Sequence, residues 1–154
     1  MTKKRYLQDF IIEDLQHKMV FVGGPRQVGK TTLARDVGEE KYKKYTYLNW
    51  DNSDDRIAII KNSFSTALPL IVFDEIHKYR RWKNYIKGQF DVNKEKYNIL
   101  VTGSARLDTY RRGGDSMQGR YHYYRLHPFS LREVLEKKPS LKINERLDFL
   151  SANK

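Results

Sequence analysis

The feature that most constrains this chain is the stretch GPRQVGKT at residues 24–31, which fits the phosphate-cradling pattern G-x-x-x-x-G-K-[ST]. Gly24 and Gly29 let the backbone curl so that successive N–H groups point at one anion. Apolar residues 19–22 predict a buried strand before the loop, and residues 33–37 predict a helix after it. The helix would turn its positive dipole end toward the same anion. The alternative, a strand–turn–helix with a chance lysine, does not explain this combination.

The residue types in the loop indicate a nucleoside triphosphate with Mg²⁺. Lys30 would place a point charge on the outer phosphates, and the Thr31 hydroxyl would ligate Mg²⁺. We therefore predict that the nucleotide is bound by a continuous set of residues: Gly24, Pro25, Arg26, Gln27, Val28, Gly29, Lys30, Thr31 and Thr32.

A second diagnostic stretch, LPLIVFDE, covers residues 68–75. Its unbroken apolar run predicts a strand buried on both faces, as in a parallel sheet. Asp74 at the strand end would hold Mg²⁺ together with Thr31, and Glu75 would polarise the attacking water. A solvated acidic strand end is the alternative, and the intact phosphate loop argues against it. His77 is interpreted as a polar neighbour of the site or a surface residue.

Hydrophobic periodicity predicts alternating helices and strands along the rest of the chain. Trp82 falls on an expected helix at a core position, and Gly38 is a plausible helix stop. A charged linker is expected at residues 39–44, a mobile loop at 108–117 and a weak helix at 139–154. The helices are expected at 6–17, 30–38, 53–62, 80–91 and from 130, and the strands at 19–23, 45–50, 68–75, 97–104 and 121–126.

Polar residues also follow two other predicted strands. Asp51 comes at the end of one strand, where a capping or turn role is favoured over a catalytic one. Thr102 and Ser104 end another strand, and either could sense the γ-phosphate or cap the next helix. Ser130 and Glu133 form a Ser-x-x-Glu capping box at the last helix start.

Composition limits the class of protein. The 154 residues make up one domain, and 39% of them are hydrophobic, without an apolar run of the roughly 18 residues that a membrane span needs. No signal peptide is recognised after the basic residues 3–5, and there is no cysteine. We therefore expect a cytoplasmic protein without a membrane partner.

The formal charge of +11 is concentrated in one block. Residues 78–132 contain thirteen Lys and Arg against four Asp and Glu, a net charge of +9. Such a block can bind nucleic acid, or it can form solvated faces around a triphosphate site. Both interpretations stay open.

Taken together, these residues resemble the ATPase domain of a prokaryotic branch of the AAA+ superfamily. The resemblance covers about residues 5–137. It rests on five motifs in the order expected for the branch: Gly24–Leu33, Asp74–Lys78, Thr102–Ser104, Gly119–Arg120 and Pro128–Leu135.

The resemblance implies a P-loop NTPase α/β fold, a three-layer sandwich. Its five-stranded, mainly parallel sheet would have the order 5-1-4-3-2, with helices on both faces. It also implies the catalytic residues Glu75, Lys30, Ser104 and Arg120. Ser104 becomes the favoured γ-phosphate sensor. Arg120, which chemistry alone would leave on the surface, becomes a candidate γ-phosphate arginine, acting within the chain or on a neighbouring subunit.

The resemblance further implies an ATPase core at residues 1–137 and, at 138–154, a helical tail that begins a missing C-terminal region. The leading hypothesis is Mg²⁺-dependent ATP hydrolysis in a regulatory or switch role, with self-association as an option. The alternatives are a nucleotide sensor with little hydrolysis and a nucleic-acid-associated ATPase that uses the basic block. The preference for ATP over GTP rests on the resemblance and on the lack of an N-K-x-D motif.

Overall fold

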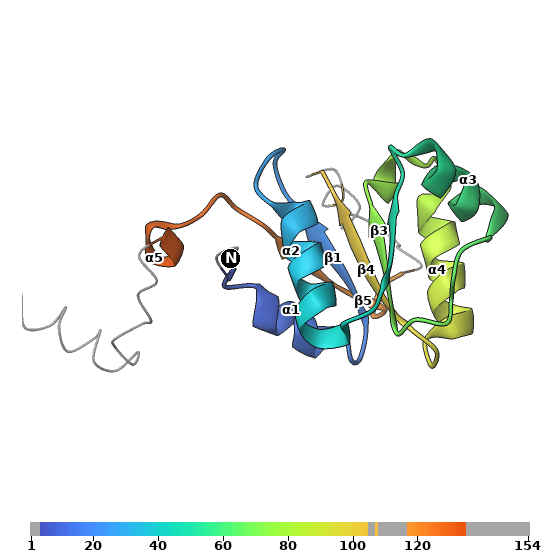
Figure 1. Ribbon diagram of the computed structural model, residues 1–154, viewed down its shortest axis with the longest axis horizontal. Helices are drawn as coiled ribbons and strands as arrows, with labels where there is room; N and C mark the ends of the chain where they lie inside the picture. The colour runs from blue at the N-terminus through green and yellow to red at the C-terminus, as the bar shows by residue number, and fades with distance from the viewer. Residues whose placement is uncertain (1–3, 105–106, 108–116, 135–154) are drawn as a thin grey trace, which may run out of the picture.

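The computed structural model describes residues 4–104, 107 and 117–134. These residues form a five-stranded sheet with helices on both faces (Figure 1). The strands are β1 Met19–Gly23, β2 Thr46–Asn49, β3 Leu70–Asp74, β4 Asn98–Gly103 and β5 Tyr121–Arg125. They lie in the order β2-β3-β4-β1-β5, and every neighbouring pair is parallel. The predicted order 5-1-4-3-2 is the same order counted from the other edge, so the α/β fold is confirmed.

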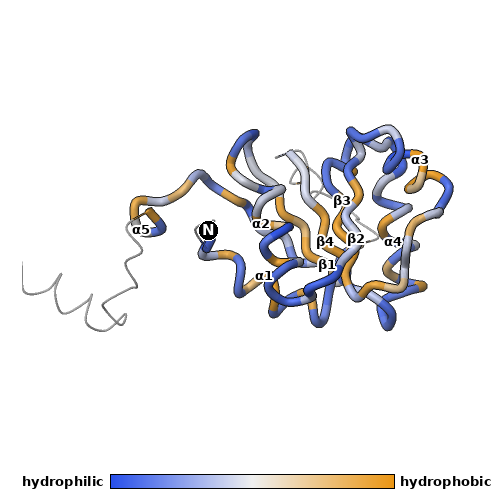
Figure 2. The backbone as a smooth tube through the Cα atoms, viewed as in Figure 1, coloured by the Kyte–Doolittle hydropathy of each residue, from blue (hydrophilic) through white to orange (hydrophobic). Residues whose placement is uncertain are grey.

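The central strands form the driest layer of the molecule. All residues of β1 and β3 are buried, and β4 is buried from Ile99 onward. The hydropathy colouring shows these strands as apolar segments enclosed by more polar helices (Figure 2). Covering both faces of a parallel sheet explains why the strands are apolar without alternation.

One face of the sheet is covered by α1 (Gln8–Asp14) and α2 (Lys30–Val37). Ile11 of α1 and Leu33 of α2 pack in one cluster with the side chains of alternate strand residues. Those strand residues are Val20, Val22, Leu70, Val72 and Leu100. The phosphate-loop helix is therefore fixed against the centre of the sheet.

The opposite face is covered by α3 (Ser53–Lys61) and α4 (Trp82–Asn93). Ile59 of α3 and Trp82 and Ile86 of α4 pack against the other set of strand side chains, which includes Phe21 and Phe73. Trp82 is 3% exposed and tilts against the Phe21 ring, so its predicted core role is confirmed.

The helices lie where the sequence predicts them, with ends that shift by a few residues, and the end at Gly38 is corrected. Gly38 does not stop the helix: its φ is −61°, and a π-helical segment continues from Gly38 to Tyr42. A Cβ on Gly38 would lie 2.6 Å from the Tyr45 ring, so glycine here permits close packing. The chain turns at Lys43, where φ is +64°. The linker expected at 39–44 is therefore largely helical.

The remaining elements are short. A 3-10 turn, Ile76–Lys78, follows β3, and α5 covers Leu131–Val134. Asn52 caps α3 by accepting from the backbone N–H groups of Asp54 and Asp55, and the Ser130–Glu133 capping box forms as predicted. The expected loop at 108–117, apart from buried Met117, and the expected tail at 138–154 lie outside the described residues. Within the described part of the chain, no helix has the length and hydrophobicity to cross a membrane.

The packing of α4 predicts a position-dependent cost of truncation. Ile86→Ala should lower the free energy of unfolding by about 2–5 kcal/mol, because the fully buried side chain leaves a cavity. Val92→Ala on the same helix should stay within about 0.5 kcal/mol, since Val92 is 76% exposed. Urea unfolding followed by circular dichroism measures both, and equal losses would contradict this account of the core.

Candidate functional site

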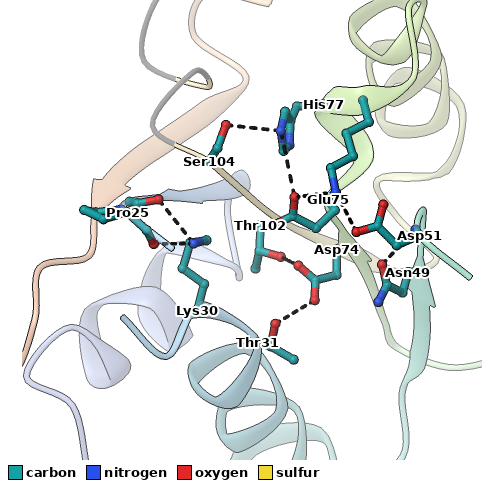
Figure 3. Close-up of polar contacts among 12 residues, drawn as sticks. Pro25, Lys30, Thr31, Asn49, Asp51, Asp74, Glu75, His77, Thr102 and Ser104 are labelled. Carbon is teal, nitrogen blue, oxygen red and sulfur yellow. Dashed lines mark hydrogen bonds and ion pairs between the residues drawn. The ribbon is translucent and has the colours of Figure 1, made fainter. Parts of the chain in front are cut away.

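The carboxyl ends of the parallel strands meet at one edge of the sheet and enclose a cleft of about 950 Å³. Open α/β sheets place their ligands at this edge. Figure 3 shows polar side chains converging there from the phosphate loop, β2, β3 and β4. The cleft is lined by Gly24, Pro25, Arg26, Lys30, Thr31, Asn49, Asp51, Asp74, Glu75, His77, Lys78 and Ser104.

The phosphate loop has the backbone that its glycines predict. Gly29 has φ of +90° and caps α2, a left-handed conformation that glycine adopts without strain. Gly24 is required for a different reason, because a Cβ there would lie 2.4 Å from the Leu126 carbonyl oxygen. Val28 is buried against the core, whereas Gln27 and Thr32 are exposed. The loop therefore offers a phosphate its backbone and the side chains of Lys30 and Thr31.

The Lys30 ammonium folds back over the loop. Its Nζ donates to the carbonyl oxygens of Gly24 at 3.2 Å and Pro25 at 2.6 Å (Figure 3). Burial lowers the pKa of Lys30 below its usual value, although Glu75 and Asp74 act in the opposite direction. Glu75 and Asp74 act on this buried cation only at a distance. A triphosphate would place an anion in direct contact with it.

Asp74 is the centre of the polar contacts. It is 2% exposed, and its carboxylate accepts hydrogen bonds from hydroxyls on three different elements. Thr31 of α2 donates to Oδ2 at 2.8 Å, Tyr47 of β2 donates to the same oxygen, and Thr102 of β4 donates to Oδ1. Burial, the bond to Asp74 and its negative charge together raise the pKa of Tyr47, so the phenol stays protonated as a donor.

The oxygen donors at this point suit Mg²⁺. Mg²⁺ prefers hard oxygens and is commonly held by one or two carboxylates plus substrate phosphates. Thr31 and Asp74 already lie in contact beside the loop. Within residues 4–104, 107 and 117–134, no group of three or more His, Asp or Glu could hold a metal by itself. The Thr31 hydroxyl and the Asp74 carboxylate fit a metal that is shared with a bound phosphate.

Glu75 follows Asp74 with φ of +57°, an uncommon conformation for a residue other than glycine. Its carboxylate lies 3.3 Å from Lys78 Nζ and 3.9 Å from His77 Nε2. Lys78 also pairs with Asp51 at 2.5 Å, so one ammonium bridges two carboxylates. Asp51 thus lines the cleft but takes part in this ion pair, while the capping of α3 is done by Asn52.

The two candidate sensors are separated by the structure. Ser104 lines the cleft, and its Oγ lies 3.1 Å from His77 Nε2. Thr102 is fully buried beneath Asp74. His77 is therefore a polar neighbour of the site, 10% exposed, and not a surface residue. A γ-phosphate role for Ser104 stays a prediction.

Arg120 lies away from the cleft, which corrects the idea that it acts on the phosphate of its own chain. Its carbonyl accepts from Met19 N at the amino end of β1, and its Nε pairs with Asp91 at 2.7 Å. The phosphate loop follows the other end of β1. Because a strand rises about 3.3 Å per residue, the length of β1 separates Arg120 from the loop. The predicted role of Arg120 on a neighbouring subunit is not affected by this distance.

The sequence analysis did not single out two site residues on β2. Tyr47 and Asn49 alternate along β2 with core residue Leu48, and both point polar atoms to the site edge. Their position next to Asp51, at the end of a predicted strand, is the sequence feature that could have identified them. The resemblance implied that β2 lies next to β3, but the sequence does not give the register that places Asn49 beside Asp74.

The parallel sheet, the loop and the Thr31–Asp74 contact define a P-loop NTPase domain. The model of the AAA domain family matches residues 16–135. The chain belongs to this family, whose members are nucleotide-binding, ATPase-like domains. No match was found among curated proteins.

Solved structures show the same fold at low identity. The Orc1 protein of Aeropyrum pernix, solved with DNA, aligns over 100% of this chain and 56% of its own with 16% identity and a TM-score of 0.62. The RuvB Holliday junction branch migration motor of Thermotoga maritima covers 84% and 46%, with 18% identity and a TM-score of 0.55. The Pif1 helicase of Bacteroides, solved with ADP-AlF3 and single-stranded DNA, covers 84% and 43%, with 17% identity and a TM-score of 0.56. The chain thus spans about half the length of each.

The contacts of Asp74 predict that removing the buried Thr102 hydroxyl strongly lowers the free energy of unfolding. Thr102→Val should cost about 1.5–3 kcal/mol of unfolding free energy, because it removes a hydrogen bond to a buried carboxylate while keeping the shape. Thr46→Val on β2 is the matched control, since its hydroxyl donates to Ser65 O in an exposed setting, and should cost less than about 1 kcal/mol. Similar losses in guanidinium unfolding would show that the Asp74 contact is not special.

Proposed function

We propose that this chain binds ATP with Mg²⁺ and hydrolyses it, and that the hydrolysis serves a regulatory switch. The observation that carries the proposal is the contact between Thr31 Oγ1 and Asp74 Oδ2 at 2.8 Å beside the phosphate loop. It brings together the two oxygen donors that a phosphate-bound Mg²⁺ needs from the protein. The family membership supports the nucleotide-binding part of the proposal.

Each cleft residue would have a role that follows from its position. Lys30 and the loop N–H groups would hold the phosphates, while Thr31 and Asp74 would hold the metal, which stabilises charge on the transferred phosphoryl group. Glu75, which lines the cleft next to Asp74, would accept a proton from the attacking water. Ser104 would contact the γ-phosphate.

The ion pair of Glu75 with Lys78 supports slow basal turnover. The Lys78 ammonium, 3.3 Å from the Glu75 carboxylate, competes with an attacking water for contact with it. Opening this pair, together with an arginine supplied by a neighbouring subunit, would raise the rate. Such arginines are worth about 10³–10⁵ in rate where they act. Arg120 is the candidate for this role between subunits.

Glu75→Gln tests the assignment of the base. ATP turnover in the presence of Mg²⁺ should fall by about 10²–10⁴, because the amide cannot take the proton, while affinity for ADP stays within about twofold. Glu95→Gln, at an exposed position after α4, should leave both quantities unchanged. A Glu75→Gln variant with the wild-type rate would overturn the catalytic assignment. If wild-type protein binds nucleotide but never turns it over, the sensor alternative replaces the enzyme.

The same assay should be run across protein concentrations. Specific activity that rises with concentration would support an arginine contributed by a second copy, and the loss of that rise in Arg120→Ala would identify it. A constant specific activity would remove Arg120 from the mechanism.

A second candidate function, association with nucleic acid, is favoured by the surface around α4. Basic residues on and beside this helix are Arg80, Arg81, Lys83, Lys87, Lys94 and Lys96. The carboxylates there are Asp91, which pairs with Arg120, and Glu95. The Orc1 and Pif1 structures were solved with DNA, which supports this surface as a candidate nucleic-acid interface.

Nucleic-acid binding through this surface would depend steeply on salt. The logarithm of the association constant should fall with the logarithm of salt concentration by about 0.9 per duplex phosphate contacted. Replacing Lys87 and Lys94 by Gln should reduce the slope, whereas replacing Lys43 and Lys44, remote on the chain, should not. Fluorescence anisotropy with duplex DNA measures this, and an unchanged slope would assign these residues to a solvated face.

A further inference from the structure

Arg5, just before α1, is a buried cation in contact with the phosphate loop. The residue is 4% exposed, and its guanidinium donates to three acceptors. Nη1 donates to the carbonyl of Val28 at 2.8 Å, Nη2 to that of His127, and Nε to Glu133 Oε1 at 2.9 Å. Burying a charge is costly unless it is paired and hydrogen-bonded, so these three bonds hold Arg5 in one place.

Glu133, the partner of Arg5, is also fully engaged. Its Oε1 accepts from Tyr6 N, and its Oε2 accepts from the backbone N and the hydroxyl of Ser130. Burial acts to raise the pKa of Glu133, but hydrogen bonds from Ser130 and Arg5 outweigh it, so the pKa lies below the usual range. The Phe129 ring covers the guanidinium at 4.1 Å. The segment after β5 thus closes around Arg5.

The same segment contacts the other end of the phosphate loop. Leu126 N donates to Gly23 O at 2.8 Å, and the Leu126 carbonyl lies where a Cβ on Gly24 would stand. Residues 126–133 therefore touch the loop directly at its start and, through Arg5, near its end at Val28. In Figure 1 the chain runs from β5 past this end of the sheet to α5, close to the N-terminus.

We propose that Arg5 is a positioning residue for the phosphate loop, which links the loop's conformation to the docking of residues 126–133. By linkage, nucleotide on the loop would favour the docked segment, and a docked segment would strengthen nucleotide binding by the same factor. A force or a binding partner that undocks residues 126–133 would then lower the affinity for nucleotide. This inference rests on the proposed nucleotide binding and adds a route by which it is regulated.

The test measures affinity for a methylanthraniloyl derivative of ADP, with Mg²⁺, in matched variants of the full chain. Arg5→Gln and Glu133→Gln should each weaken binding about tenfold, within the 5- to 150-fold range of typical couplings. The double variant should lose little more than either single one, because both break one contact. Arg5→Lys should fall between, since a single ammonium cannot serve three acceptors.

Lys4→Gln is the control for general effects. It removes the same charge one residue earlier, but Lys4 pairs with Asp9 and Glu40 at the surface. Its affinity should equal that of the wild type. Melting temperatures of all variants are recorded, and binding is measured well below them, so that a stability effect alone leaves the dissociation constant unchanged.

A second measurement uses the unaltered protein. Hydrogen exchange in peptides that cover residues 126–134 should slow when ADP is added, and the slowing should disappear in Arg5→Gln. Wild-type affinity in a folded Arg5→Gln variant, or exchange that ignores ADP, would overturn the inference while leaving nucleotide binding intact. If the wild-type chain binds no nucleotide, the proposed function fails, and the inference fails with it.

Discussion

The carboxylate of Asp74 is the interaction on which the site depends. Three hydroxyls from α2, β2 and β4 donate to it, so it fixes the phosphate-loop helix against two strands that neighbour β3. A buried carboxylate is tolerated only with such donors, and without them its charge would resist burial. The group that would take part in metal binding is therefore also the group that aligns the elements around it.

The two faces of the sheet divide into separate tasks. On one face, α1 and α2 pack on β1 and β3 and set the direction of the phosphate loop. On the other face, α3 and α4 form a larger apolar cluster with aromatic contacts, such as the edge contacts of Phe73 with Phe64 and Tyr85. Between them, the strand ends present polar groups, and the contacts of buried Asp74 and Thr102 are shielded from water, a setting in which hydrogen bonds act more strongly.

Charged side chains at and behind the cleft form two separate sets of contacts. Lys78 bridges Glu75 and Asp51, while Lys30 rests on loop carbonyls. Arg5 and Glu133 form a second, more deeply buried pair behind the loop. Under the proposed function, the first pair would act on the Glu75 carboxylate and the second on the backbone of the phosphate loop. Hydrolysis and affinity would then be tuned by different contacts.

The sequence by itself determined the phosphate loop, the acidic strand end, the strands and the Ser130–Glu133 capping box, because these depend on residue spacing over a few positions. The resemblance added the sheet order. Only the tertiary structure decided that Tyr47 and Thr102 serve Asp74, that Gly38 is a packing contact, and that Arg120 lies at the opposite edge from the loop. The Arg5–Glu133 pair joins residues 128 positions apart, and no local pattern encodes such a contact. Its partners are fixed by how the strands align, which follows from burying both faces of the sheet at once.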